Sequence, residues 1–90
     1  MLIDCHSHLF LYRDFDEKIK ENIEKDVKYI IENGLDPSSN RKVLDESSKY
    51  NIVLCSLGFH PTECIKYNID QIEKEIEFIE SNSNKIVAIG

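Results

Sequence analysis

Four apolar runs, spaced at regular intervals, are the feature of this sequence that most constrains its fold. The runs begin roughly 25–33 residues apart, which is the spacing of strand–helix units, and an amphipathic stretch separates each run from the next. Continuously apolar strands that alternate with amphipathic helices are typical of a parallel sheet covered by helices. The sequence therefore predicts an α/β fold of parallel βα repeats, with strands at about Leu2–His8, Val27–Glu32, Ile52–Leu57 and Ile86–Ile89.

The stretch after the first run carries the signals with which a helix begins. This helix is expected from about Phe15 to Lys25, and Asp14 and Glu17 have the spacing of a capping box at its start. Its apolar residues are four positions apart, as one face of a helix requires: Phe15, Ile19 and Ile23. We expect this face to pack on the sheet.

Two further helices have similar start signals. Asp36 is placed as the cap of a helix that has Pro37 at its first position and continues to about Lys49. Asn68 and Gln71 form a second cap pair. The helix that follows this pair is expected to turn a stripe of isoleucines inward: Ile69, Ile72, Ile76 and Ile79.

This strand–helix order is that of a (β/α)8 barrel, in which each of eight parallel strands is followed by a helix. Four strands make half of such a barrel, so residues 1–90 are expected to form one incomplete domain, the N-terminal half of a TIM-like barrel. A dinucleotide-binding fold has no support, because no Gly-x-Gly-x-x-Gly follows the first strand. An open half-barrel exposes strand edges and apolar faces, and we expect it to self-associate.

An Asp-x-His-x-His motif lies in the first predicted strand. Side chains two positions apart on a strand project from the same face, so Asp4, His6 and His8 are expected to line up. The strand rise puts the two imidazoles roughly 6–7 Å apart, close enough to converge on one metal ion. Asp4 is expected behind these ligands, where it could accept a ring N–H and fix the tautomer. The alternative is two chance histidines in a core strand.

The third histidine falls at the same end of the predicted sheet. His60 follows the third strand in Gly58-Phe59-His60-Pro61, where Gly58 permits a close approach of the backbone to a ligand and Pro61 rigidifies the loop. Functional residues of β/α barrels gather at the carboxyl ends of the strands. His60 is therefore a candidate for contacting substrate, including a phosphate group. The alternative is a loop histidine without a role.

Charge and cysteine content exclude other classes of function. The formal net charge is −6, so a broad basic surface for nucleic acid is absent and phosphate binding without a metal should be weak. Cys5, Cys55 and Cys64 lack a CxxC spacing, which favours free thiols and a cytoplasmic location. Cys5 is expected to be a small buried residue on the opposite face of the first strand. No apolar run approaches the ~20 residues of a membrane span and no signal peptide opens the chain, so no membrane partner is expected.

Four segments of the chain form a set of motifs at defined intervals: Met1–Leu9, Gly34–Asp36, Ser56–Pro61 and Val87–Gly90. Together they resemble the N-terminal part of TatD-type metal-dependent deoxyribonucleases. The His-x-His motif alone is shared with amidohydrolases and PHP phosphoesterases. The Gly-Phe-His-Pro and Ala-Ile-Gly motifs at these intervals are what make the chain similar to TatD.

The resemblance implies a (β/α)8 hydrolase barrel that holds two divalent metal ions and cleaves phosphodiester bonds of DNA with a metal-activated water. It implies that His6 and His8 bind one metal and that His60 lies in the pocket for the scissile phosphate. Metal cations would supply the positive charge that an acidic protein lacks at the scissile bond. Mg, Mn and Zn are not distinguished, and DNA or another phosphodiester is the expected partner.

The family's Ala-Ile-Gly continues into a glutamate that bridges both metals, whereas this chain ends at Gly90. Later histidines and an aspartate of the family also lie beyond this point. Three protein ligands are the usual minimum of a catalytic metal site, so residues 1–90 alone are expected to hold metal weakly and to lack activity. The alternatives are another His-x-His hydrolase, acting as a phosphoesterase or amidohydrolase, and a non-catalytic half-barrel remnant.

Overall fold

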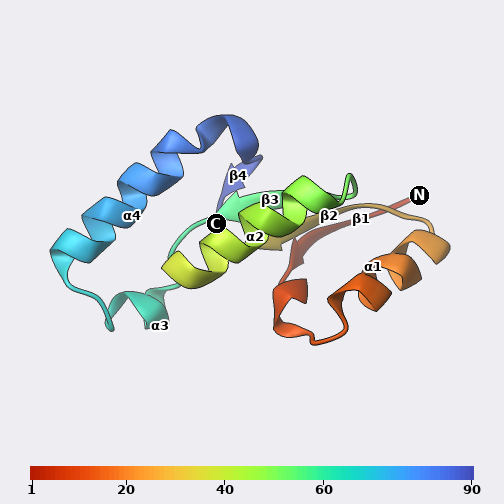
Figure 1. The fold of residues 1–90 in the computed structure, drawn as a ribbon, viewed down its shortest axis with the longest axis horizontal. Helices are drawn as coiled ribbons and strands as arrows, with labels where there is room; N and C mark the ends of the chain where they lie inside the picture. Colours follow the sequence, from red (N-terminus) through yellow and green to blue (C-terminus); the bar gives the residue numbers. More distant parts are fainter.

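A four-stranded parallel sheet forms the centre of the computed structural model, which describes residues 1–90 (Figure 1). The strands lie side by side in the order β1-β2-β3-β4, the same as their order in the chain. They are β1 (Leu2–Ser7), β2 (Val27–Asn33), β3 (Val53–Leu57) and β4 (Ala88–Ile89). The helices are α1 (Phe15–Glu24), α2 (Pro37–Lys49), α3 (Pro61–Cys64) and α4 (Ile69–Ser81), with short 3-10 turns η1 (Leu9–Leu11) and η2 (Ser83–Lys85).

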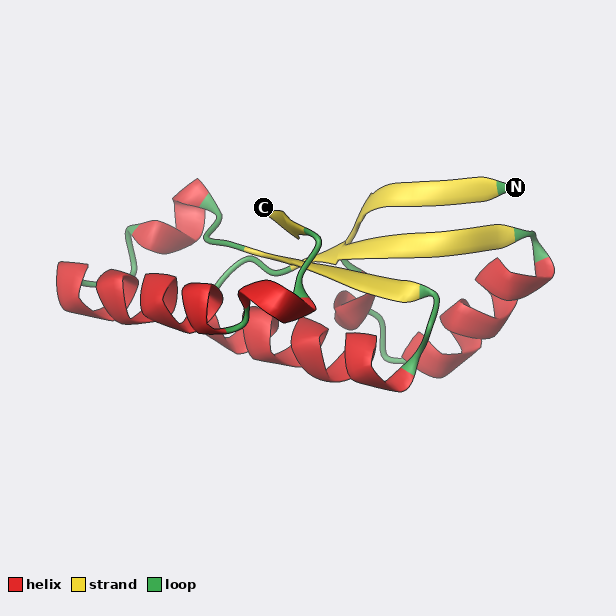
Figure 2. Ribbon diagram, turned by 90° about the horizontal axis from the view of Figure 1, so that it is seen from above, coloured by secondary structure: helices red, strands yellow, loops and turns green.

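The three long helices, α1, α2 and α4, lie on one side of the sheet, and the other side is bare (Figure 2). Apolar side chains between the two layers form two buried clusters. One contains Phe10, Val43, Cys55, Leu57 and Ile79, and the other contains Leu9, Ile19, Ile30 and Val53. All three strand pairs are parallel, which confirms the prediction of parallel βα units in a half-barrel.

The pairing of β1 differs from that of the inner strands. β2 and β3 pair in continuous register, whereas the register of β1 against β2 shifts between Asp4 and Ser7. β1 ends at Ser7, and His8 has left the strand conformation (φ −131°, ψ 53°) as the residue that precedes η1. The second histidine of the motif therefore lies in a turn and not, as predicted, on the strand.

All three predicted helix starts are confirmed, and at two of them the predicted cap is formed as well. Asp36 accepts the backbone N–H of Ser39 at 2.8 Å, and Ser39 Oγ accepts the backbone N–H of Asp36 at 3.0 Å. Asn68 and Gln71 make the same reciprocal pair at the start of α4. These boxes satisfy backbone donors that the first helical turn leaves free.

The predicted capping box at the start of α1 is wrong. Asp14 stands at the N-cap position, but its side chain makes no capping hydrogen bond. Its backbone (φ −97°, ψ 43°) lacks the extended conformation that directs a cap side chain over the first turn. The carboxylate lies 3.9 Å from Lys18 Nζ instead. Ile19 is the buried residue of the predicted apolar face, whereas Ile23 is exposed.

Burial also differs from prediction on α4 and β1. Ile79 is buried as expected, but Ile69 and Ile76 are largely exposed, and Glu75 is buried in their place. This follows from the side of α4 that packs inward, which carries Glu75 and Ile79 one helical turn apart. Cys5 is exposed and not buried, because α1 packs against β2 and leaves β1 uncovered.

The shortest elements were not predicted from the sequence. The turns η1, η2 and α3 are three or four residues long, and so short a turn has no repeating apolar face. β4 covers only the second half of the predicted Ile86–Ile89 strand. None of the helices has the length and apolar character that crossing a membrane requires.

Candidate metal centre

His6 and His8 lie next to each other at the carboxyl end of β1. Their ring centroids are 4.9 Å apart and the ring planes are nearly perpendicular, at 87°. The rings are closer than the strand rise predicted, because His8 belongs to the turn before η1. Both histidines line the same cavities. Two adjacent imidazoles are suitable ligands for a divalent metal, so the donors present fit such an ion although they do not complete its coordination.

A backbone carbonyl on the neighbouring strand fixes the ring of His8. His8 Nδ1 lies 2.9 Å from the carbonyl oxygen of Asn33 at the end of β2. A carbonyl oxygen only accepts hydrogen bonds, so Nδ1 carries the proton and donates it. The lone pair therefore resides on Nε2, which is the form in which a neutral imidazole binds a metal. Phe10 meets the ring edge-on, with centroids 5.8 Å apart.

Asp4 lines a cavity of about 520 Å³ together with the two histidines, but it makes no hydrogen bond to either ring. Its Oδ1 accepts the backbone N–H of His6 at 3.1 Å. At His8, the ring-fixing role expected of Asp4 belongs to the carbonyl of Asn33. The predicted role of Asp4, behind the histidines that would bind a metal, stays a prediction.

His60 lies at the end of β3, and β2 separates it from the histidine pair. All three histidines nevertheless line one cavity of about 190 Å³, whose other lining residues are Asn33, Gly34, Leu35, Phe59, Pro61 and Gly90. No group of three or more His, Cys, Asp or Glu side chains is arranged to hold a metal ion. The structure thus brings the three predicted histidines, but not Asp4, to one cavity, and their separate roles stay predictions.

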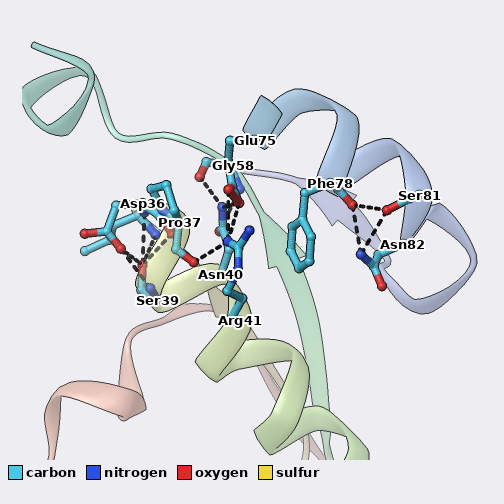
Figure 3. A network of polar contacts seen from close by, with 11 residues as sticks. Asp36, Pro37, Ser39, Asn40, Arg41, Gly58, Glu75, Phe78, Ser81 and Asn82 are labelled. Carbon is cyan, nitrogen blue, oxygen red and sulfur yellow. Dashed lines mark hydrogen bonds and ion pairs between the residues drawn. The ribbon is translucent and has the colours of Figure 1, made fainter. Parts of the chain in front are cut away.

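A buried amide fixes the backbone from which His60 projects (Figure 3). Asn40 of α2 is fully buried, and its Nδ2 donates to the carbonyl of Gly58 at 2.9 Å while its Oδ1 accepts the Gly58 N–H at 3.1 Å. The N–H of His60 donates to the carbonyl of Leu35 at 2.8 Å. A Cβ at position 34 would lie 1.9 Å from Asn40 Oδ1, so Gly34 makes room for this amide.

Glu75 of α4 completes this polar network (Figure 3). Its carboxylate is 3% exposed and accepts hydrogen bonds from Arg41 Nη1 at 2.9 and 3.0 Å and from Asn40 Nδ2 at 3.1 Å. The guanidinium of Arg41 lies 3.9 Å from the centroid of the Phe78 ring. Charge-assisted bonds of this kind compensate the burial of a carboxylate. The network therefore joins α2, α4 and the loop that leads to His60.

A second acidic group is buried beneath the turn that follows His8. Glu32 of β2 is fully buried, and neither of its carboxylate oxygens has a donor in hydrogen-bonding geometry. Burial, and then the adjacent carboxyl of Glu46, raise the pKa of Glu32 to about 8, while the backbone N–H groups of Leu9 and Phe10 oppose the rise. The protonated carboxyl of Glu32 that this pKa favours can donate to Glu46, which gives a partner to oxygens that otherwise lack one.

Glu32, Asn33 and Asn40 were not predicted as site residues. The first two had a usable signal, because they are polar residues at the carboxyl end of an apolar run, where barrel sites gather. Asn40 had none, since one asparagine in a polar helical turn is ordinary. Its role depends on Gly58, which is distant in the sequence.

Four parallel strands joined by helices, with a histidine pair where the first strand ends, define part of a β/α barrel that carries donors for a metal ion. The family model described as TatD related DNase matches residues 3–90. The chain therefore belongs to the TatD-related DNase family, as its motifs predicted.

Two relatives agree with this assignment. The chain is 29% identical over 96 residues to the "Uncharacterized metal-dependent hydrolase YabD" of Bacillus subtilis (strain 168), covering 100% of this chain and 36% of that protein. The crystal structure of YjjV, a TatD homolog from Escherichia coli K12, superposes with a TM-score of 0.78 at 25% identity, covering 99% of this chain and 36% of YjjV. The chain thus spans 36% of the length of both relatives.

Proposed function

We propose that residues 1–90 form the N-terminal, metal-binding part of a hydrolase that cleaves phosphodiester bonds of DNA with the help of divalent metal ions. Membership of a metal-dependent hydrolase family supports the reaction class, and the family's description suggests DNA as substrate. The observation that carries the proposal is the one cavity lined by His6, His8 and His60. Two ions in the complete site and a cytoplasmic location belong to the same proposal.

The ring orientations support different roles for the histidines. His8 directs an unprotonated Nε2 away from the Asn33 carbonyl and His6 stands beside it, so these two rings would hold one divalent ion. An ion bound there would polarise a phosphoryl oxygen and make its water a stronger nucleophile. His60 stands one strand further along the sheet, where it would contact the phosphate and not the ion.

The charge of the cavity is consistent with a metal-dependent reaction. No lysine or arginine lines the cavity that the three histidines share, and the whole chain has a formal net charge of −6. A phosphodiester needs positive charge beside it to bind and to react. In this proposal divalent ions supply that charge.

The test uses the longest soluble polypeptide that contains residues 1–90. His6→Ala and His8→Ala are expected to lower bound metal, measured by elemental analysis after gel filtration. His60→Ala is expected to keep the metal and to lower the turnover of a labelled DNA oligonucleotide. Cys5→Ser is the matched control, because Cys5 is exposed and directly precedes His6 in the sequence but lines neither cavity. It should change neither quantity.

Three results would contradict the proposal. Equal loss of metal in His60→Ala and His6→Ala would make His60 a ligand. Turnover that persists after metal removal with EDTA would exclude a metal-dependent step. Preference for an amide or a phosphate monoester over DNA would assign the site to another class of metal-dependent hydrolase.

A further inference from the structure

The loop that carries His60 also places a hydroxyl against its ring. Thr62 Oγ1 lies 2.7 Å from His60 Nδ1, and the backbone N–H of Thr62 donates to the same nitrogen at 3.2 Å. His60 is the N-cap residue of α3, and Pro61 occupies the first position of that helix. Both polar hydrogens of Thr62 can therefore be directed at one ring nitrogen.

These contacts determine where the proton of the neutral ring resides. A ring nitrogen that carries a proton has no free lone pair, so the N–H of Thr62 could not donate to a protonated Nδ1 of His60. Nδ1 is therefore the unprotonated nitrogen, and the Thr62 hydroxyl donates to it as well. The neutral ring carries its hydrogen on Nε2, so His60 presents a hydrogen-bond donor at the end of the ring remote from α3.

The backbone around His60 is held independently of Thr62. The N–H of His60 donates to the carbonyl of Leu35 at 2.8 Å, and Asn40 binds both polar backbone groups of Gly58 two residues earlier. Thr62 is exposed and makes no hydrogen bond beyond its own helix start through its side chain. A substitution at Thr62 should therefore change the tautomer of the His60 ring and leave the backbone of the loop in place.

His8 is held in the opposite tautomer. Its Nδ1 donates to the carbonyl of Asn33, which leaves the lone pair on Nε2. Both histidines line the same cavity. The cavity therefore contains one Nε2 that can bind a metal, on His8, and one Nε2–H that can donate to an anionic oxygen, on His60.

We propose that Thr62 is a positioning residue that holds His60 in the Nε2–H tautomer, so that His60 donates a hydrogen bond to a phosphate oxygen and does not compete for the metal. The identity of the acceptor rests on the proposed function, whereas the tautomer does not. Hydrogen bonds to ionised oxygens are stronger than those between neutral groups. A ring whose donor is set in advance binds phosphate without first changing tautomer.

The experiment is a long-range proton–nitrogen NMR spectrum of the histidine rings in the full-length protein, at a pH where the rings are neutral. Protonated and unprotonated ring nitrogens resonate far apart, and exchange between tautomers gives intermediate positions. His60, assigned with a His60→Gln variant, is expected to show an unprotonated Nδ1 and a protonated Nε2. His8 is the internal control and is expected to show the reverse.

Two variants of Thr62 test its part in this arrangement. Thr62→Val keeps the shape of the side chain and removes the hydroxyl. The ratio of the Nε2–H to the Nδ1–H tautomer of His60 should therefore fall about fivefold, the effect of one ordinary hydrogen bond. Its two nitrogen signals then move toward each other while those of His8 stay in place. Thr62→Ser retains the hydroxyl and the wild-type spectrum. A protonated Nδ1 of His60 in the wild type, or a Thr62→Val spectrum identical to the wild type, would overturn the proposal.

Inorganic phosphate tests the acceptor without relying on catalysis. Donation to phosphate selects the Nε2–H tautomer, so phosphate should return the His60 signals of Thr62→Val toward their wild-type positions, and sodium chloride at equal ionic strength should not. Signals that do not respond to phosphate refute the donor role. If they respond but the protein hydrolyses no DNA, the proposed function fails and the role of Thr62 stands.

Discussion

Replacing Glu32 with glutamine should stabilise the protein at neutral pH, by an amount that grows as the pH rises. The Glu32 carboxyl is buried against Glu46, and its pKa is raised from 4.5 to about 8. Burial and the Glu46 carboxyl both disfavour its ionised form. Glutamine has the shape of the protonated acid and can donate to Glu46, but it never has to take up a proton.

The magnitude follows from linkage. Because the pKa of Glu32 is higher in the folded state than the ordinary 4.5, the stability contributed by its protonated form is complete below pH 4.5 and is lost as the pH rises through about 8. One pKa unit corresponds to about 1.4 kcal/mol, so the loss totals about 5 kcal/mol, of which about 3 kcal/mol has occurred by pH 7. Glu32→Gln avoids this loss.

The assay is urea denaturation followed by circular dichroism between about pH 5 and about pH 9, on the longest soluble polypeptide that contains residues 1–90. The free energy of unfolding of Glu32→Gln should exceed that of the wild type increasingly toward alkaline pH. Glu73→Gln is the control, because Glu73 is an exposed glutamate of α4. A difference between Glu32→Gln and wild type that stays constant, or that widens toward acid pH, would refute the reasoning.

Further predictions concern the hydrogen bonds of Asn40 to the Gly58 backbone, which support the His60 loop, and the open half-barrel. Asn40→Ala should destabilise the protein by about 2–4 kcal/mol in urea denaturation, since both polar backbone groups of Gly58 lose a buried partner. A loss of stability no larger than that of a substitution at an exposed position would contradict this role of Asn40. Gly34→Ala should also destabilise, but less in an Asn40→Ala background, because its Cβ would meet the Asn40 side chain; strictly additive effects would refute this contact. Residues 1–90 expressed alone should self-associate in sedimentation velocity through the exposed apolar residues of β1 and β4, and a sharp monomer that unfolds cooperatively would disprove it. The same fragment should show no EDTA-sensitive hydrolysis of DNA, because its histidine pair lacks further ligands; robust activity would mean that associated copies complete the site.

The backbone architecture was predictable because its signals are local and repeated. The four apolar runs and the cap at Asp36 each lie within a few residues of the element that they specify. The capping box predicted at Asp14 does not form because it depends on more than local sequence. The Asp14 side chain is suited to capping, but capping depends on a backbone conformation that the preceding turn sets.

The sequence predicted which histidines would meet at the site, but not how their rings would be held. His6, His8 and His60 could be expected at one edge because parallel strands end together. Their protonation could not, because the partner of His8 is a backbone carbonyl on another strand. The buried carboxyl of Glu32 was hidden for a related reason, since its neighbour Glu46 comes from a helix later in the chain. Such pairings arise from tertiary structure and leave no periodic pattern in the sequence.

The match between the spatial order of the strands and their order in the chain has a consequence for biosynthesis. After β1, each strand pairs with the one made just before it, so its partner strand already exists when a βα unit leaves the ribosome and the unit can dock at once. His8 acquires its ring orientation once Asn33, 25 residues later, has joined the sheet. His60 finds its partner only two residues later, in Thr62. The metal-binding side of the cavity is therefore assembled first, and the phosphate-binding side is added to it as β3 and its loop arrive.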